Sequence, residues 1–400
     1  MHLDLTAEQH TLRKELRAYY RDLFTPELRR ALTEEWDDMG GPVFRQIVRR
    51  MGRDGWLGIG WPKEHGGQGR GPLEQLIFWE ETYRARAPLP IIAVNTIGPT
   101  LIQFGTPEQK AMLPAILRGE LHFGVGYSEP GAGTDLASLQ TKAVRNGDPR
   151  HPSESDEWVI NGQKIFTTHA HDADYIWLAA RTDPDAPKHK GISIILVPTS
   201  APGFSVTPIR TLGGERTNAT YYADVRVPVS NTVGPVNGGW GLITNQLNHE
   251  RVTLATPGVA DRALDEVWSW ASRTRRSDGT RLIDEPWVQL NLARCYAKLE
   301  ALKLLNWKSA WSLQAGDPDP AAASAVKVMG SEFFMECYRL LLEITGLAGT
   351  VVGGEPGCLF GGFLEQAYRG ATTLTFGGGV NAIQRDIIAL SALELPRARR

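Results

Sequence analysis

The sequence predicts an α+β protein in which a helical region, a β region and a helical bundle follow one another along 400 residues. Three observations support this order. Apolar residues recur at helical spacing in the first third, and short segments rich in β-branched and aromatic residues occupy the middle. From Gly241 onward helical periodicity returns. We expect an N-terminal α-helical domain over 1–122, a β domain over 123–234 and a four-helix bundle over 235–400.

Composition is typical of a soluble globular protein. The chain has 43 Lys+Arg against 45 Asp+Glu, a net charge of -2 and 42% hydrophobic residues. This balance excludes a disordered chain and argues against a nucleic-acid binder that uses a basic face. The three cysteines form no CxxC pair, so no disulfide framework or zinc ribbon is expected. No apolar run suits a signal peptide or a membrane span, and we expect a cytoplasmic protein with no membrane contact.

The N-terminal region begins with a capping box, in which Thr6 and Gln9 precede apolar residues at helical spacing. Further helical patterns run over 43–51 and 73–84. The segment GWLGIGWPKEHGGQG at 55–69 separates them, because glycine and proline interrupt helices.

The middle region contains four segments that favour strands: EWVINGQKIFTT, ADYIWLAART, GISIILVP and ATYYADVRVP. Turn formers bound each of them, which is typical of antiparallel strands in a sandwich or a barrel. The polar stretch at 146–157 should be an exposed loop between two strands.

The C-terminal region shows four helical stretches, at 241–274, 285–314, 320–346 and 380–393. Short polar or glycine-rich links separate them, so a bundle is expected. Pro257-Gly258 lies inside the first stretch and should kink it or open it locally.

A glycine-rich motif, GYSEPGAGTDLASL, occupies 126–139. Gly131 and Gly133 free the backbone to approach a ligand, and Ser128 and Thr134 add hydroxyl groups, so the stretch could hold a phosphate. The spacing is not GxGxxG and strands follow it, which disfavours a Rossmann site. Taken alone, such a turn is more often structural.

A second motif, NGQKIFTTHAHDADYIWLAART, occupies 161–182. Phe166 lies two residues before Thr168, and an aromatic ring beside a hydroxyl suits a planar heteroaromatic ligand. Taken alone, the motif is better explained by an ordinary core aromatic. The histidines and aspartates of HAHDAD resemble a metal cluster, but no second ligand group at zinc-like spacing accompanies them, so no metal is expected.

The order SEPGAGTD, then NGQKIFTT, then AD…AART closely resembles the acyl-CoA dehydrogenase family, and GWLGIGWPKEHGGQG and IQRDIIA extend the resemblance over nearly the whole chain. The resemblance implies a central β-barrel, with FAD held between it and the bundle. It also implies α,β-dehydrogenation of a CoA thioester, with electrons passed to an electron-transfer flavoprotein.

The resemblance also implies positions for the cofactor. Phe166 takes the place of the family's usual Trp against the isoalloxazine, and Thr168 supplies the hydroxyl at flavin N5. The residues that complete the expected cofactor site are Tyr127, Ser128, Gly133, Thr134, Arg369, Gly377, Gly378 and Gly379.

The catalytic base is where the chain departs from the commonest family pattern. Many members carry a Glu in Tyr-Glu-Gly-Thr, but here Gly378 stands at that position and cannot accept a proton. Glu250 shares a helical face with Ile243, in the apolar stripe that also includes Leu247 and Leu254. Burial there would raise the carboxyl pKa and strengthen the base. The pattern alone favours a boundary Glu that pairs with Arg251 or another cation.

The resemblance resolves this choice, because isovaleryl-CoA dehydrogenase and its relatives carry their base in the matching Glu-Arg pair. It implies Glu250 as the base, Arg251 as the cation for the CoA end, and the Gly378 N–H as a donor to the thioester oxygen. The chain most resembles the Glu-bearing subunit of heterotetrameric dehydrogenases that degrade the cholesterol side chain.

Gln289 also favours a heteromeric assembly. Homotetrameric members of the family usually have an Arg at this position, which contacts the FAD pyrophosphate of a neighbouring subunit. The expected substrate is therefore a bulky steroid acyl-CoA, and the expected partner is a non-identical subunit in an α2β2 assembly. The alternatives are an acyl-CoA oxidase and a non-catalytic structural subunit, and the presence of Glu250 argues against the latter.

Overall fold

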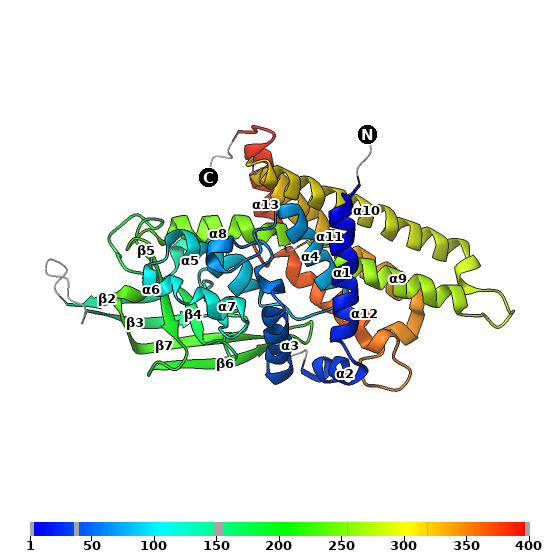
Figure 1. Ribbon diagram of the computed structural model, residues 1–400, viewed down its shortest axis with the longest axis horizontal. Helices are drawn as coiled ribbons and strands as arrows, with labels where there is room; N and C mark the ends of the chain where they lie inside the picture. Colours follow the sequence, from blue (N-terminus) through cyan, green and yellow to red (C-terminus); the bar gives the residue numbers. More distant parts are fainter. Residues whose placement is uncertain (1–3, 36–39, 148–155, 254, 318, 397–400) are drawn as a thin grey trace.

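The computed structural model describes residues 4–35, 40–147, 156–253, 255–317 and 319–396, with the side chains of Glu35 and residues 247–253 left out. Helices lead, a sheet follows and long helices end the chain (Figure 1). The expected α+β class with its three successive regions is confirmed. No helix in these ranges is both long and apolar enough to cross a lipid bilayer.

The N-terminal region consists of short helices and turns. Thr6 and Gln9 form the predicted capping box, and the buried face of the first helix carries Leu12, Leu16 and Tyr20. The helices are α1 (Ala7–Leu23), α2 (Pro26–Glu35), α3 (Pro42–Arg53), α4 (Pro72–Arg84), α5 (Gly98–Phe104), α6 (Pro107–Lys110) and α7 (Leu113–Leu117). The patterns at 43–51 and 73–84 are α3 and α4.

The middle region forms one eight-stranded sheet in the order β6-β7-β3-β2-β4-β5-β8, with β1 pairing parallel to β4. The strands are β1 (Phe123–Gly126), β2 (Lys142–Asn146), β3 (Glu157–Lys164), β4 (Tyr175–Arg181), β5 (Ile192–Pro198), β6 (Phe204–Arg210), β7 (Arg216–Pro228) and β8 (Thr232–Val233). The four predicted strands are β3, β4, β5 and β7. The predicted loop at 146–157 lies mostly outside the described residues.

The sheet curves around its own core. Ile176 on β4 and Ile195 on β5 share a buried cluster with Trp158 on β3 and Val225 on β7. The opposite face of β4, including Trp177, packs into the core of the N-terminal helices. The sheet therefore has a barrel-like interior and a second, helix-covered face.

The C-terminal region contains more helices than expected. They are α8 (Gly239–Thr253), α9 (Gly258–Arg273), α10 (Pro286–Gln314), α11 (Pro320–Thr345), α12 (Phe363–Ala371) and α13 (Asn381–Ser391). The single helix expected over 241–274 is wrong, because the chain breaks before Pro257 into α8 and α9, as the kink prediction allowed. A Cβ on Gly258 would lie 2.1 Å from the Glu80 carbonyl oxygen, so it is the absence of a side chain at 258 that lets the start of α9 pack directly on α4.

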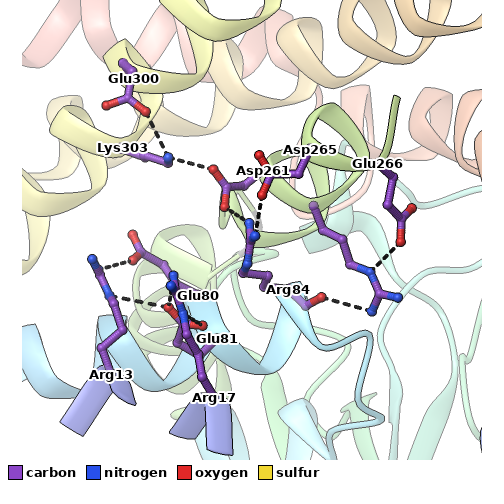
Figure 2. Close-up of polar contacts among 11 residues, drawn as sticks. Arg13, Arg17, Glu80, Glu81, Arg84, Asp261, Asp265, Glu266, Glu300 and Lys303 are labelled. Atoms are coloured by element: carbon purple, nitrogen blue, oxygen red, sulfur yellow. Dashed lines mark hydrogen bonds and ion pairs between the residues drawn. The ribbon is translucent and has the colours of Figure 1, made fainter. Parts of the chain in front are cut away.

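A charged cluster fastens α1 and α4 to α9 and α10 beside this break (Figure 2). Arg13 pairs with Glu80 at 2.9 Å, and Arg84 bonds Asp261, which Lys303 also contacts at 2.7 Å. Burial raises the pKa of Glu80 to about 7, although Arg13 opposes the shift. The N-terminal region is thus tied to the bundle by ion pairs rather than by apolar packing alone.

Candidate active site

The two sequence motifs lie side by side at the end of β1 and β3. The Ile165 N–H donates to the Ser128 carbonyl at 2.9 Å. The ammonium of Lys164, which is 1% exposed, donates to the Tyr127 carbonyl at 3.0 Å and to the Glu129 carboxylate at 2.8 Å. Burial lowers the pKa of Lys164 to about 8, against the opposing effect of Glu129. This buried ion pair holds the glycine-rich motif against the second one.

The side chain of Phe166 is exposed to solvent rather than buried. Its side chain is 60% exposed and its φ is +59°, a backbone conformation that non-glycine residues rarely adopt and that often marks functional sites. Thr168, two residues on, is half-buried, with its hydroxyl 3.2 Å from that of Thr217. The alternative of a core aromatic is therefore wrong, and the structure offers an exposed ring beside a hydroxyl.

The glycine-rich turn has open space around its backbone. Glu129 and Ala132 exchange backbone hydrogen bonds at 2.9 and 3.0 Å, which fixes the turn. A Cβ at Gly131 or Gly133 would meet nothing within 4 Å, and Gly133 and Thr134 are exposed. The backbone here is accessible to a ligand.

Tyr127 connects the β domain to helix α8. Its hydroxyl donates to the Gln246 side chain and accepts a hydrogen bond from the Trp177 indole at 3.1 Å. The Gln246 amide in turn donates to Thr100 at 3.2 Å. The Tyr127 hydroxyl is thus already engaged, which leaves the ring and backbone to line a cofactor. Sequence reasoning missed Gln246, although a Gln one turn before Glu250 on an apolar face was a usable signal.

The predicted base belongs to the same helix. Ile243 and Gln246 are 0% and 1% exposed, so the face of α8 that leads to Glu250 is buried. Glu250 and Arg251 lie in the helical backbone of α8, but their side chains are outside the described residues. Their roles remain predictions.

The glycine run forms the bundle half of the site. Gly378 and Gly379 have φ values of +65° and +98°, and Lys327 on α11 donates to the Gly379 carbonyl at 2.6 Å. Gln384 is fully buried, and neither atom of its side-chain amide has a partner within the described part of the chain. Sequence reasoning missed Lys327 and Gln384, because a single polar residue inside a helical pattern does not reveal its partner.

The structure gives less support to the two residues that were predicted in relation to the FAD phosphates, Arg369 and Gln289. The Arg369 guanidinium bonds Glu365 and the Leu212 carbonyl, so it ties α12 to the turn between β6 and β7, and a cofactor phosphate would have to compete with Glu365. Gln289 is exposed on α10.

The residues of HAHDAD form structural contacts with other parts of the protein. Asp172 bonds Arg45 at 2.9 Å, Asp174 accepts from the His122 N–H at 2.8 Å, and His171 contacts Asn218. The described residues contain no group of three side chains suited to a metal ion.

These features fit an extended cofactor with a planar ring and a phosphate chain. Such a ligand would cover an exposed ring, an accessible glycine turn and a buried amide that has no partner among the described residues. A helical domain, a barrel-like sheet and a helical bundle with this site define the helix–sheet–bundle class of enzymes.

Within that class the chain belongs to the acyl-CoA dehydrogenase family. Sequence models of the family's N-terminal, middle and C-terminal domains match residues 6–120, 124–225 and 237–393. The chain is therefore an acyl-CoA dehydrogenase, an oxidoreductase that acts on CH–CH groups, and members of this family use FAD. The resemblance inferred from the motifs is confirmed.

The chain is similar to several mycobacterial proteins over its whole length. It is 53% identical over 409 residues to the acyl-CoA dehydrogenase FadE26 and 49% identical over 403 residues to FadE29, both of Mycobacterium tuberculosis, with full coverage of each chain. Among solved structures, it matches a chain of the ChsE4-ChsE5 complex from Mycobacterium tuberculosis with a TM-score of 0.92 and 53% identity. It matches a chain of the Tcur3481-Tcur3483 steroid acyl-CoA dehydrogenase with the same TM-score and 51% identity. Both matches cover all of each chain.

Proposed function

We propose that the chain is the base-bearing subunit of an FAD-dependent dehydrogenase that converts a steroid side-chain acyl-CoA to the 2-enoyl-CoA. The observation that carries the proposal is the combination of Gly378 with a face of α8 that is buried up to the turn before Glu250. Similarity to a structure described as a steroid acyl-CoA dehydrogenase supports the substrate class.

Each residue then has a defined task. Glu250 accepts the α-proton of the thioester, and the Gly378 N–H donates to the thioester oxygen, where negative charge develops. Bound FAD would supply the hydride acceptor for the β-hydrogen and the route for electrons to an electron-transfer flavoprotein. Arg251 binds the phosphate-bearing CoA end. Glycine at 378 also leaves room for a bulky acyl group.

The cofactor would be held by both halves of the site. Phe166 would pack against the flavin ring, and Thr168 would bond its edge. The residues that would approach the ribityl and phosphate groups are Tyr127, Ser128, Gly133, Thr134, Arg369, Gly377, Gly378 and Gly379.

A non-identical subunit would complete the assembly. Gln289 is neutral and cannot form with a neighbour's pyrophosphate the ion pair that an Arg would form. The α10 surface also exposes large apolar side chains, including Trp287, Leu290 and Trp311 at 45%, 51% and 64% exposure. Such a face is typical of an interface. Both similar structures are named for two different chains, which supports a non-identical partner, and we propose that the two subunits form an α2β2 tetramer.

The assembly is tested by purifying the chain alone and with a co-expressed candidate partner. We expect weak FAD binding by the lone chain and full flavin content in the tetramer, because FAD and partner strengthen each other's binding. Flavin per chain and assembly mass are the measurements. A fully flavinylated, active homotetramer of the chain would refute the α2β2 proposal.

The reaction is tested by anaerobic bleaching of the flavin with a panel of CoA thioesters. Steroid side-chain thioesters should bleach it faster than short straight chains. Rapid reoxidation in air would identify an acyl-CoA oxidase instead. In Glu250→Gln, which keeps the shape but cannot take the proton, turnover should fall at least about 10²-fold with FAD retained. Near-normal turnover would show that another group is the base.

A further inference from the structure

Lys327 lies in the middle of α11, with 1% of its surface exposed. Its ammonium is 2.6 Å from the Gly379 carbonyl, 2.7 Å from the Asn381 side-chain oxygen and 3.3 Å from the Thr375 carbonyl. An ammonium has three donors and no acceptor, so each donor has an oxygen. Desolvating this charge is costly unless such bonds are made, and the bonds therefore hold firmly.

The three oxygens bracket the glycine run. Thr375 precedes it, Asn381 follows it, and Gly379 is its last member. Glycine has little conformational preference of its own, so contacts must fix the direction of each N–H in this turn. The backbone supplies a bond from the Gly377 N–H to the Thr373 carbonyl at 2.8 Å, which lies before Gly378.

Asn381, which follows the glycine run, is itself bonded to α11. The Asn381 amide donates to the Ser331 hydroxyl at 3.0 Å and to Glu332 at 3.3 Å, both on α11. Ser331 lies one helical turn after Lys327. The far end of the glycine run is therefore attached to α11 through side chains.

The Gly378 N–H forms no hydrogen bond within the described ranges of the chain. We propose that Lys327 is a positioning residue that clamps the glycine turn to α11 and so aims the Gly378 N–H at the thioester oxygen. The inference rests on the proposed function for the identity of that oxygen. The clamp itself is a property of the free protein and can be measured without substrate.

The test uses the complex with its partner subunit and compares Lys327→Met with Lys298→Met. Lys298 on α10 pairs with Glu336 on α11 on the exposed side, so the control makes the same substitution at a lysine that also contacts α11. In Lys327→Met, flavin reduction at saturating thioester should slow by about 10–100-fold, the size expected when a catalytic group is slightly misplaced, with a smaller change in KM. Lys298→Met should match the wild type.

Two further measurements separate positioning from general damage. The carbonyl stretch of the bound thioester, read by infrared difference spectroscopy, should shift less in Lys327→Met than in the wild type. Lys327→Gln, which keeps two donors, should recover part of the shift. A variant that loses activity only in proportion to lost folded protein, with an unchanged carbonyl shift, would overturn the inference.

Amide exchange of residues 376–380 in the substrate-free complex gives an independent readout. It should be faster in Lys327→Met than in Lys298→Met, and Ser331→Ala should cause a smaller increase. Equal exchange in the two lysine variants would overturn the clamp. A wild-type complex that no thioester reduces would instead contradict the proposed function, while the exchange result would still decide the clamp.

Discussion

The two halves of the candidate site are held in different ways. In the β half, Lys164 pairs with a carboxylate, Glu129, and the motif segments also bond through their backbones. In the bundle half, Lys327 bonds carbonyl and amide oxygens of a glycine-rich turn. Both lysines are 1% exposed, yet one stabilises a fixed ion pair and the other constrains a flexible segment. The β half is thus part of the folded core, whereas the bundle half can change its substrate contacts at small structural cost.

The largest effect is expected in the β half. Lys164→Met leaves the buried Glu129 without its cation, and breaking a buried pair costs about 3–5 kcal/mol of the free energy of unfolding. The unfolding midpoint in urea is the measurement. Lys188→Met removes an exposed pair with Asp135 on the same domain and should leave the midpoint unchanged. Similar midpoints for the two variants would show that the buried pair is not structural.

The charged cluster that joins the N-terminal region to the bundle should make the stability of the protein depend on pH. Glu80 has a pKa of about 7 in the folded protein and a value of 4.5 as a free group. Between these values the folded state holds the proton and the unfolded state does not. Stability therefore falls as pH rises from about 4.5 to 7, by on the order of 3 kcal/mol. The difference in unfolding midpoint between the wild type and Glu80→Gln should change over this range. A constant difference would mean that Glu80 does not titrate there.

The glycine run should control substrate size. Gly378→Glu restores a carboxylate at the other family position, but its side chain would occupy the space for a bulky acyl group. A steroid thioester should lose at least about tenfold more kcat/KM than a short straight-chain thioester, the effect of overpacking a fitted cavity. Equal losses for both substrates would count against the proposed role of this space.

Regular elements were predictable because their signals are local. The capping box at Thr6 and the strand pattern of β4 lie within a few residues of sequence. Strand β6 was missed because it carries Pro208 and is largely exposed at one end of the sheet. The break between α8 and α9 was expected as a kink or a local opening, and its extent was not predictable because it depends on how closely Gly258 approaches α4.

The parts of the candidate site that lie in recognisable motifs were predictable from the sequence. The parts held by contacts between residues far apart in the sequence were less predictable. The proximity of Ser128 to Phe166 follows from two recognisable motifs. Lys164 meets Glu129 across 35 residues, and Lys327 meets Gly379 across 52. A lone polar residue in an apolar pattern shows that a partner is needed, but only the fold supplies the partner.

The smallest effect is expected from a matched pair of buried glutamines, one in each half. Gln246 has both amide atoms bonded, to Tyr127 and Thr100, so Gln246→Leu should destabilise the flavin-free chain by about 1–3 kcal/mol. Gln384 has no such partner among the described residues, so Gln384→Leu should leave the stability of the flavin-free chain unchanged.

If FAD supplies the missing partner of Gln384, the same substitution should weaken FAD binding by about 1 kcal/mol, roughly fivefold in Kd. Thermal unfolding of the flavin-free chains and FAD titration of the complexes measure the two effects separately. A destabilisation as large as that of Gln246→Leu would show that the Gln384 amide is bonded within the protein. Unchanged FAD affinity would show that the cofactor does not reach it.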